Sequence, residues 1–184
     1  MYLNHALRLN GFEVLNGYSD IMTPFLGAAG GNAGALGWWS NLRAFSLDRF
    51  APASSGGRLP IQRYLSTNLL NRITYFESDQ LRSLAPEVVN NLPTDTLYLP
   101  TEGSAPKRNE EVLQSWEAVR TLSARFANTD QVAALQACLV AIAEAQELYE
   151  QIPLPLDTKS NAEHLEPLRE GIELFARLAE IEIA

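Results

Sequence analysis

The stretch Gly11-Phe12-Glu13-Val14-Leu15-Asn16-Gly17-Tyr18-Ser19-Asp20, with the glycine-rich run that follows it to Leu42, decides the fold of this chain. Residues 21–42 contain no charged side chain, and five of them are glycine. Residues 12–16 predict a buried strand, Asp20 is suited to cap a helix that begins at Ile21, and residues 33–39 can form a second buried strand. A helical crossover at 20–29 joins parallel strands, so we favour a parallel β–α–β unit.

Residues 21–39 also fit two other interpretations. In one continuous helix, Gly27, Gly30, Gly34 and Gly37 would share a face and allow close packing against a neighbour. The 22 uncharged residues are also long enough to cross a bilayer. Because the run contains a proline, two asparagines and five glycines, it would make a poor lipid-facing surface, and we expect no membrane partner.

The remainder of the chain predicts mainly helices. Residues 2–9 fit a short amphipathic helix that stops at Asn10-Gly11. Helices are also expected at 64–76 and 77–84, and a short strand at 96–99. The last eighty residues carry three apolar stripes, one of which includes Trp116, and a possible capping box formed by Ser160 and Glu163.

These stripes predict an antiparallel three-helix bundle whose outer faces are acidic. Prolines and a glycine between residues 90 and 108 suggest a boundary, with a glycine- and arginine-rich portion at 1–105 and an acidic helical region at 106–184. The expected fold class is therefore α/β and mostly helical overall.

Charge is distributed unevenly over the 184 residues, whose net charge is -8. Residues 1–75 hold six arginines against three acidic residues, a net charge of +3, whereas residues 76–184 hold eight basic against nineteen acidic residues, a net charge of -11. The overall acidity argues against tight nucleic-acid binding. A single cysteine, Cys138, and an N-terminus without a signal-peptide pattern favour a cytoplasmic location.

A small anion is the ligand that the glycine-rich stretch suits best. A strand that ends at Asn16-Gly17 and a following helix would direct backbone N–H groups to one place, and the turn at residues 30–32 could add more. Arginine forks suit phosphate and carboxylate groups. The predicted ligand-binding residues are Asn16, Gly17, Ser19, Gly30, Gly31, Asn32, Arg43 and Arg58.

Two carboxylates are candidates for proton transfer. Glu13 is the one acidic residue in an otherwise apolar predicted strand, and burial there would raise its pKa unless it lies at a solvent-facing edge. Asp20 is the second candidate, with helix capping as its alternative role. We expect no metal site and no cofactor, because His5 and His164 lack ligand companions at suitable spacing and Cys138 lies in an alanine-rich helix.

The segments 12–20, 21–31 and 33–37 together resemble the last two strands of a (β/α)8 barrel of the aldolase- and synthase-like kind. The resemblance covers about 30 residues and implies that this end of a barrel holds a phosphate or carboxylate of the substrate. Two strands do not close a barrel. The chain would therefore be the C-terminal part of a longer protein, or a second chain would complete the sheet.

The expected function is thus binding of a small phosphate or carboxylate by residues 1–75. If the protein is an enzyme, carbonyl or phosphorylated-metabolite chemistry is expected. The alternative is a non-enzymatic interaction or oligomerisation module whose helices at 110–182 dock a protein partner or a second copy.

Overall fold

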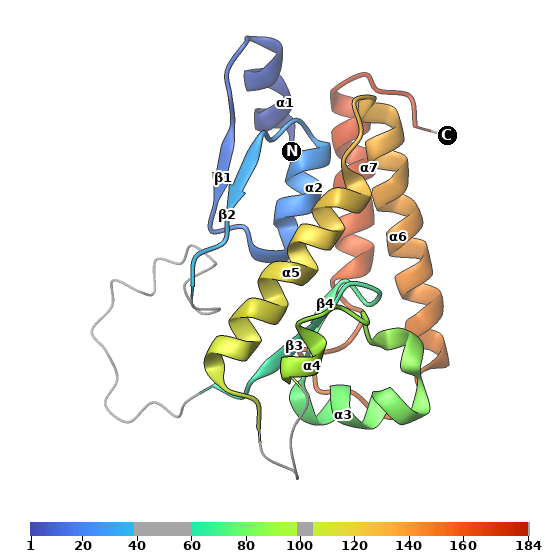
Figure 1. The fold of residues 1–184 in the computed structure, drawn as a ribbon. Helices are drawn as coiled ribbons and strands as arrows, with labels where there is room; N and C mark the ends of the chain where they lie inside the picture. The colour runs from blue at the N-terminus through green and yellow to red at the C-terminus, as the bar shows by residue number, and fades with distance from the viewer. Residues whose placement is uncertain (39–59, 99–104, 184) are drawn as a thin grey trace, which may run out of the picture.

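The computed structural model describes residues 1–38, 60–98 and 105–183, and in them the chain is a mostly helical α/β protein (Figure 1). Four helices form the main layer: α2 (Thr23–Ala28), α5 (Arg108–Phe126), α6 (Gln131–Gln151) and α7 (Leu165–Leu178). A small parallel sheet and the N-terminal helix lie at one end of this layer, and an antiparallel hairpin with short helices lies at the other.

The N-terminal residues form the predicted β–α–β unit. Helix α1 (Tyr2–Leu9) ends where Gly11 adopts a φ of 81°, as its sequence indicated. Strand β1 (Leu15–Gly17) is parallel to β2 (Ala33–Ala35), and both are shorter than expected. The prediction that these strands are buried is wrong, because all their residues except the half-buried Asn16 are exposed. The 3-10 helix η1 (Asp20–Met22) and α2 connect them, with Pro24 in the first turn of α2.

Both alternatives for residues 21–39 are therefore wrong. A six-residue helix followed by a strand at 33–35 is neither one continuous helix nor a segment long enough to cross a bilayer. Neither two-stranded sheet in the described residues closes into a barrel. The resemblance to the end of a (β/α)8 barrel stays a prediction.

The last three helices run antiparallel to one another in sequence order, as the apolar stripes predicted (Figure 1). Phe25 of α2 packs at the centre of their core, where its ring centroid lies 5.0 Å from that of Phe126. Residues on both sides of position 105 thus share one core, and the division of the chain there stays a prediction. Trp116 was predicted to belong to one of the apolar stripes that form the bundle core, but 36% of it is exposed.

The segment predicted as a helix at 64–76 is instead a hairpin of β3 (Arg63–Ser66) and β4 (Asn71–Thr74). Residues 64–66 are all buried, so this part of the strand does not show the alternation of buried and exposed positions that is typical of a surface strand. The edge of β3 is completed by the buried side-chain amide of Gln114, which accepts from Leu65 N at 3.0 Å and donates to Leu65 O at 2.9 Å. A helix face thus replaces a third strand.

Short helices follow the hairpin. Helix α3 (Tyr75–Leu84) begins with a capping box of Thr74 and Glu77, and η4 (Pro86–Val88) comes next. Where a strand was expected at 96–99, the chain forms α4 (Asp95–Tyr98). The predicted capping box at Ser160 is also wrong, because α7 begins at Leu165 and the Ser160 hydroxyl donates to Glu77.

Helix α6 is the one helix in the described residues whose length and composition would allow it to cross a membrane. Its buried residues, among them Leu135 and Ile142, belong to the core formed with α2, α5 and α7. The helix also carries Glu144, Glu147 and Glu150. We therefore interpret α6 as a core helix.

Candidate functional site

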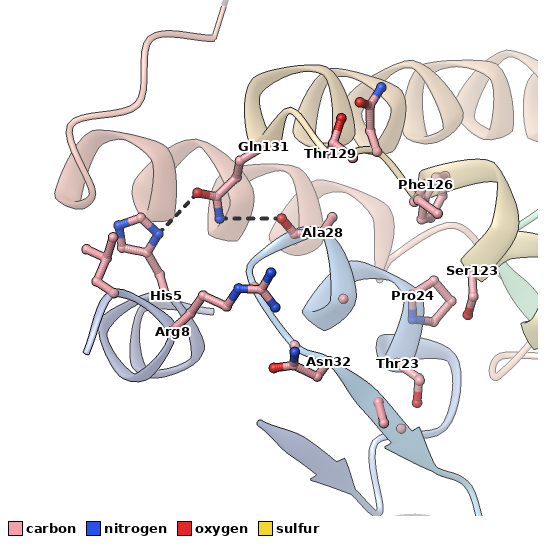
Figure 2. A pocket seen from close by; sticks show the side chains of 18 residues that line it. His5, Arg8, Thr23, Pro24, Ala28, Asn32, Ser123, Phe126, Thr129 and Gln131 are labelled. Carbon is pink, nitrogen blue, oxygen red and sulfur yellow. Dashed lines mark hydrogen bonds between the residues drawn. The ribbon is translucent and has the colours of Figure 1, made fainter. Parts of the chain in front are cut away.

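A cleft of about 720 Å³ lies where α1, the turn between α2 and β2, and the corner between α5 and α6 meet (Figure 2). Proteins bind metabolite-sized ligands in concave sites of this size. Its lining comes from three parts of the chain, residues 5–9, 23–34 and 123–131: His5, Arg8, Leu9, Thr23, Pro24, Gly27, Ala28, Gly30, Gly31, Asn32, Ala33, Gly34, Ser123, Phe126, Ala127, Asn128, Thr129 and Gln131.

Helix α1 brings His5 and Arg8 to the cleft. They lie three residues apart, on one face of the helix. The buried Asn4 holds this helix in place, because its Nδ2 donates to Asn16 Oδ1 at 3.1 Å and to Leu26 O at 3.2 Å. Asn16 therefore supports the site from behind and does not line it.

Gln131 at the start of α6 fixes the orientation of His5. Its Nε2 donates to Ala28 O at 3.5 Å, which leaves Oε1 to face His5 Nδ1 at 3.1 Å. Because an amide oxygen can only accept, the hydrogen of this bond lies on Nδ1 of His5. The imidazole thus ties α1 to α6 across one wall of the cleft (Figure 2).

The turn between α2 and β2 needs its two glycines. Gly30 has a φ of 102°, a conformation that side chains disfavour, and it packs against the backbone of α1. A Cβ at Gly31 would touch the Asn16 amide and would lie 2.9 Å from Leu26 O. Because Gly30 and Gly31 have no side chains, the turn can lie close to α1, and there it forms the floor of the cleft.

The amides of this turn do not point at a ligand, which corrects the sequence-based prediction. Gly30 N donates to Gly27 O at 3.0 Å, and Gly31 N donates to Leu26 O at 2.9 Å. Asn32 N donates to Val14 O at 2.9 Å. Since each N–H already has a carbonyl partner, an anion at this place must be bound by side chains.

Asn32 supplies one such side chain. Its Oδ1 accepts from Val14 N at 2.8 Å, and a backbone N–H can only donate, so the amide orientation is fixed. The Nδ2 group, a donor, is therefore the part of the side chain left for a ligand. Figure 2 shows this nitrogen on the side of Asn32 that faces the Arg8 guanidinium.

Arg8 is the second donor and the one arginine or lysine among the described residues of the lining. Within the described residues, its exposed guanidinium makes no hydrogen bond or ion pair. No aspartate or glutamate is among the described lining residues, although the protein has a net charge of -8. The described lining of the cleft is thus positively charged, whereas the chain as a whole is negatively charged.

Several predicted site residues lie outside the cleft. Glu13 is exposed just before β1, and Ser19 is bonded to Thr23 at 2.9 Å between the hydroxyl oxygens. Gly17 ends β1 and is absent from the lining. Arg43 and Arg58 lie outside the described residues.

Asp20 neither caps α2 nor reaches the cleft. Its carboxylate accepts two hydrogen bonds from Arg72, at 3.0 Å from Nε and 2.8 Å from Nη2. The same guanidinium donates through Nη1 to Ser115 Oγ at 2.8 Å. Asp20 therefore ties the β–α–β unit to the hairpin and α5, a structural role that its local sequence did not indicate.

A second polar cluster, around Glu77, binds the hairpin to the loop before α7. The buried Glu77 carboxylate accepts hydrogen bonds from Thr74, from the backbone of Asp157 and from Ser160. Burial alone would raise the pKa of Glu77, but these donors outweigh it and hold the pKa below its usual range. With its oxygens engaged, Glu77 stabilises the fold and is closed to a ligand.

The remaining titratable candidates are also structural. Cys138, on the predicted alanine-rich helix, is buried in the core, and burial raises its pKa to about 12. His164 is half-buried and contacts Leu70 O at 3.0 Å. Burial holds its pKa below the usual range. The described residues contain no cluster of three or more His, Cys, Asp or Glu side chains suited to a metal ion.

Comparisons with protein-family models, with curated proteins and with solved structures find no match to this chain. The geometry of the cleft is therefore the basis for a functional interpretation. The predicted ligand-binding residues Gly30, Gly31 and Asn32 line the cleft, whereas Arg8 was not among the predicted residues. Its one signal was the amphipathic spacing of His5 and Arg8, which does not reveal what α1 packs against.

Proposed function

We propose that the protein binds a small anionic ligand, a phosphate or carboxylate, in the cleft between α1, the α2–β2 turn and the α5–α6 corner. The observation that carries this proposal is that Arg8, whose guanidinium makes no bond within the described residues, lines the same cleft as the Nδ2 group of Asn32, and that the described lining has no carboxylate. An arginine and an amide N–H donor together suit an anionic oxygen.

The binding residues differ from those proposed on sequence grounds. Arg8 takes the role assigned to Arg43 and Arg58, and the Asn32 side chain takes the role assigned to backbone amides. The proposal covers binding of a carboxylate or phosphate ligand and includes no catalytic step. Glu13 and Asp20, the two residues predicted to transfer a proton, lie away from this cleft. A cytoplasmic location also belongs to the proposal, supported by the single buried cysteine.

Arg8→Ala tests the proposal, with Arg177→Ala as a matched control. Both arginines are exposed, lie in the last turn of a helix and make no side-chain bond within the described residues. Calorimetric titration with sodium acetate and with sodium phosphate should give saturable binding to the wild type and to Arg177→Ala, and at least about tenfold weaker binding to Arg8→Ala. Equal binding by both variants would contradict an anion site at Arg8.

A second candidate function is self-association through the outer edge of β1. The register with β2 directs the polar backbone groups of Val14 and Tyr18 toward β2, so those of Leu15 and Gly17 face the opposite edge. Phe12 and Leu15 are 60% and 68% exposed beside this edge. Exposed edges of this kind pair readily with another strand.

The low charge near this edge favours a second copy of the chain as the partner that pairs with β1. Residues 1–38 contain one arginine and two acidic residues, and Asp20 is neutralised by Arg72, so this end of an acidic molecule is nearly uncharged. Sedimentation velocity should show a dimer for the wild type and a monomer for Leu15→Lys. The matched exposed substitution Leu174→Lys should leave the dimer intact, and a monomeric wild type would exclude this candidate. Docking through the acidic C-terminal helices stays a prediction.

A further inference from the structure

Gly27 is a glycine that neither the backbone nor the packing of α2 requires. It is the second-last residue of this six-residue helix, and its φ falls outside the left-handed region that favours glycine. Apart from its chain neighbours and the backbone of its own helix, a Cβ built on it would have no atom within 4 Å. Glycine inside a helix lowers helix stability relative to alanine, so its presence here calls for a different reason.

That reason lies in the cleft. Gly27 is exposed and belongs to the cleft lining, so a side chain at this position would occupy space that is now open. Gly34, another lining glycine, is different, because a Cβ there would collide with Thr23. Gly27 therefore keeps part of the cleft free for an occupant.

The surroundings of this open space are mainly apolar. The cleft lining includes Leu9, Phe126 and Ala127, and Pro24 and Ala28 lie near Gly27 on α2. The charged end of the cleft offers one guanidinium and one amide donor, from Arg8 and Asn32. A guanidinium fork binds both oxygens of a carboxylate, whereas a phosphate dianion carries more charge than one arginine neutralises.

We infer that the ligand is a carboxylate with a compact apolar body, of the aryl- or branched alkyl-carboxylic acid class, whose body lies over Gly27. The inference rests on the proposed anion site, in which Arg8 and Asn32 hold the carboxylate. Gly27 is then a specificity-determining position, because the absence of its side chain makes room for the body of the ligand.

Benzoate, acetate, phosphate and benzamide are the probes that test this class, by calorimetric titration of the full chain at constant ionic strength. Benzoate should bind about tenfold more tightly than acetate, since burial of a ring adds apolar contact, and benzamide, which lacks the charge, should bind far more weakly. Phosphate should bind no better than acetate.

Gly27→Leu should abolish the advantage of benzoate over acetate while acetate binding persists. The matched control is Gly171→Leu on α7, where the glycine is also exposed and helical and a Cβ also meets open space. It should bind benzoate as the wild type does. Unchanged benzoate binding by Gly27→Leu, or phosphate binding tighter than benzoate, would overturn the inference while leaving the anion site in place. Absence of binding by acetate, phosphate and benzoate alike would overturn both.

Discussion

Glu77 provides the sharpest test of how the structure is held together. One carboxylate oxygen, Oε2, accepts from Thr74 N at 2.6 Å, Thr74 Oγ1 at 2.7 Å and Ser160 Oγ at 2.8 Å. The other, Oε1, accepts from Asp157 N at 2.5 Å. In Glu77→Gln the amide oxygen can keep the three bonds of Oε2, so the NH2 group must face the N–H of Asp157.

The expected destabilisation follows from that mismatch. Losing one hydrogen bond to a charged acceptor and leaving a donor unsatisfied costs about 2–3 kcal/mol. Glu77→Ala also removes the capping box and should cost about 3–5 kcal/mol. Urea unfolding measures both values, and the exposed carboxylate variant Glu173→Gln should change stability by less than about 0.5 kcal/mol.

The pH dependence gives an independent check. Because the folded-state pKa of Glu77 lies below its usual value, the unfolded state binds more protons in the acid range. The stabilisation from Glu77 is therefore fully present above the ordinary glutamate pKa and is lost as the pH falls through the lower folded-state pKa. Wild type should lose more stability than Glu77→Gln between pH 5 and pH 3. A Gln variant as stable as the wild type at pH 7, with the same acid dependence, would refute this reasoning.

Three further predictions concern packing. Gly31→Ala should cost about 1–3 kcal/mol, because its Cβ would press on the Asn16 amide, whereas Gly27→Ala should stabilise by about 0.5–1 kcal/mol; urea unfolding of both distinguishes a required glycine from an optional one. Trp116→Ala should cost about 2–3 kcal/mol, less than a fully buried tryptophan, and the same unfolding assay measures it. Cys138 should resist iodoacetamide at pH 8 until the protein unfolds, since burial raises its pKa to about 12.

The N-terminal β–α–β unit could be predicted because the residues that start and stop its elements lie within or next to those elements in the sequence. Gly11 stops α1, Pro24 fits the first turn of α2, and the glycines after residue 29 end that helix. The predicted bundle also follows from local periodicity. What the sequence did not indicate is that Phe25 of α2 enters the bundle core, since this contact depends on chain segments about a hundred residues apart.

The hairpin was missed for a physical reason. Leu65, Leu69 and Ile73 repeat at helical spacing, and both faces of β3 are covered, which removes the two-residue alternation of an exposed strand. The turn contains no glycine or proline; Leu70 adopts a φ of 52° instead. Gln114, a polar residue on the helix facing β3, carried no signal that it completes the edge of the strand.

Part of the cleft lining could be anticipated from the sequence. The turn at residues 30–32 is in the cleft, but its amides are used by the fold, which depends on the close approach of Val14 and Leu26. Asp20, predicted as a proton-transfer residue, is engaged by Arg72, which lies 52 positions away in the sequence. The spacing of residues along the sequence does not reveal interaction partners that lie so far apart.

Direct observation of the anion at Arg8 tests the central claim. In a nitrogen-15 NMR titration with sodium acetate at constant ionic strength, the side-chain signals of Arg8 Nε–H and Asn32 Nδ2–H should move and saturate together. The Arg177 Nε–H signal, from an exposed arginine on α7, should stay in place. Asn32→Asp, which can keep the bond to Val14 N but replaces the donor with a charged acceptor, should abolish the Arg8 shift. Equal, unsaturated shifts at Arg8 and Arg177 would show non-specific screening and would contradict the account.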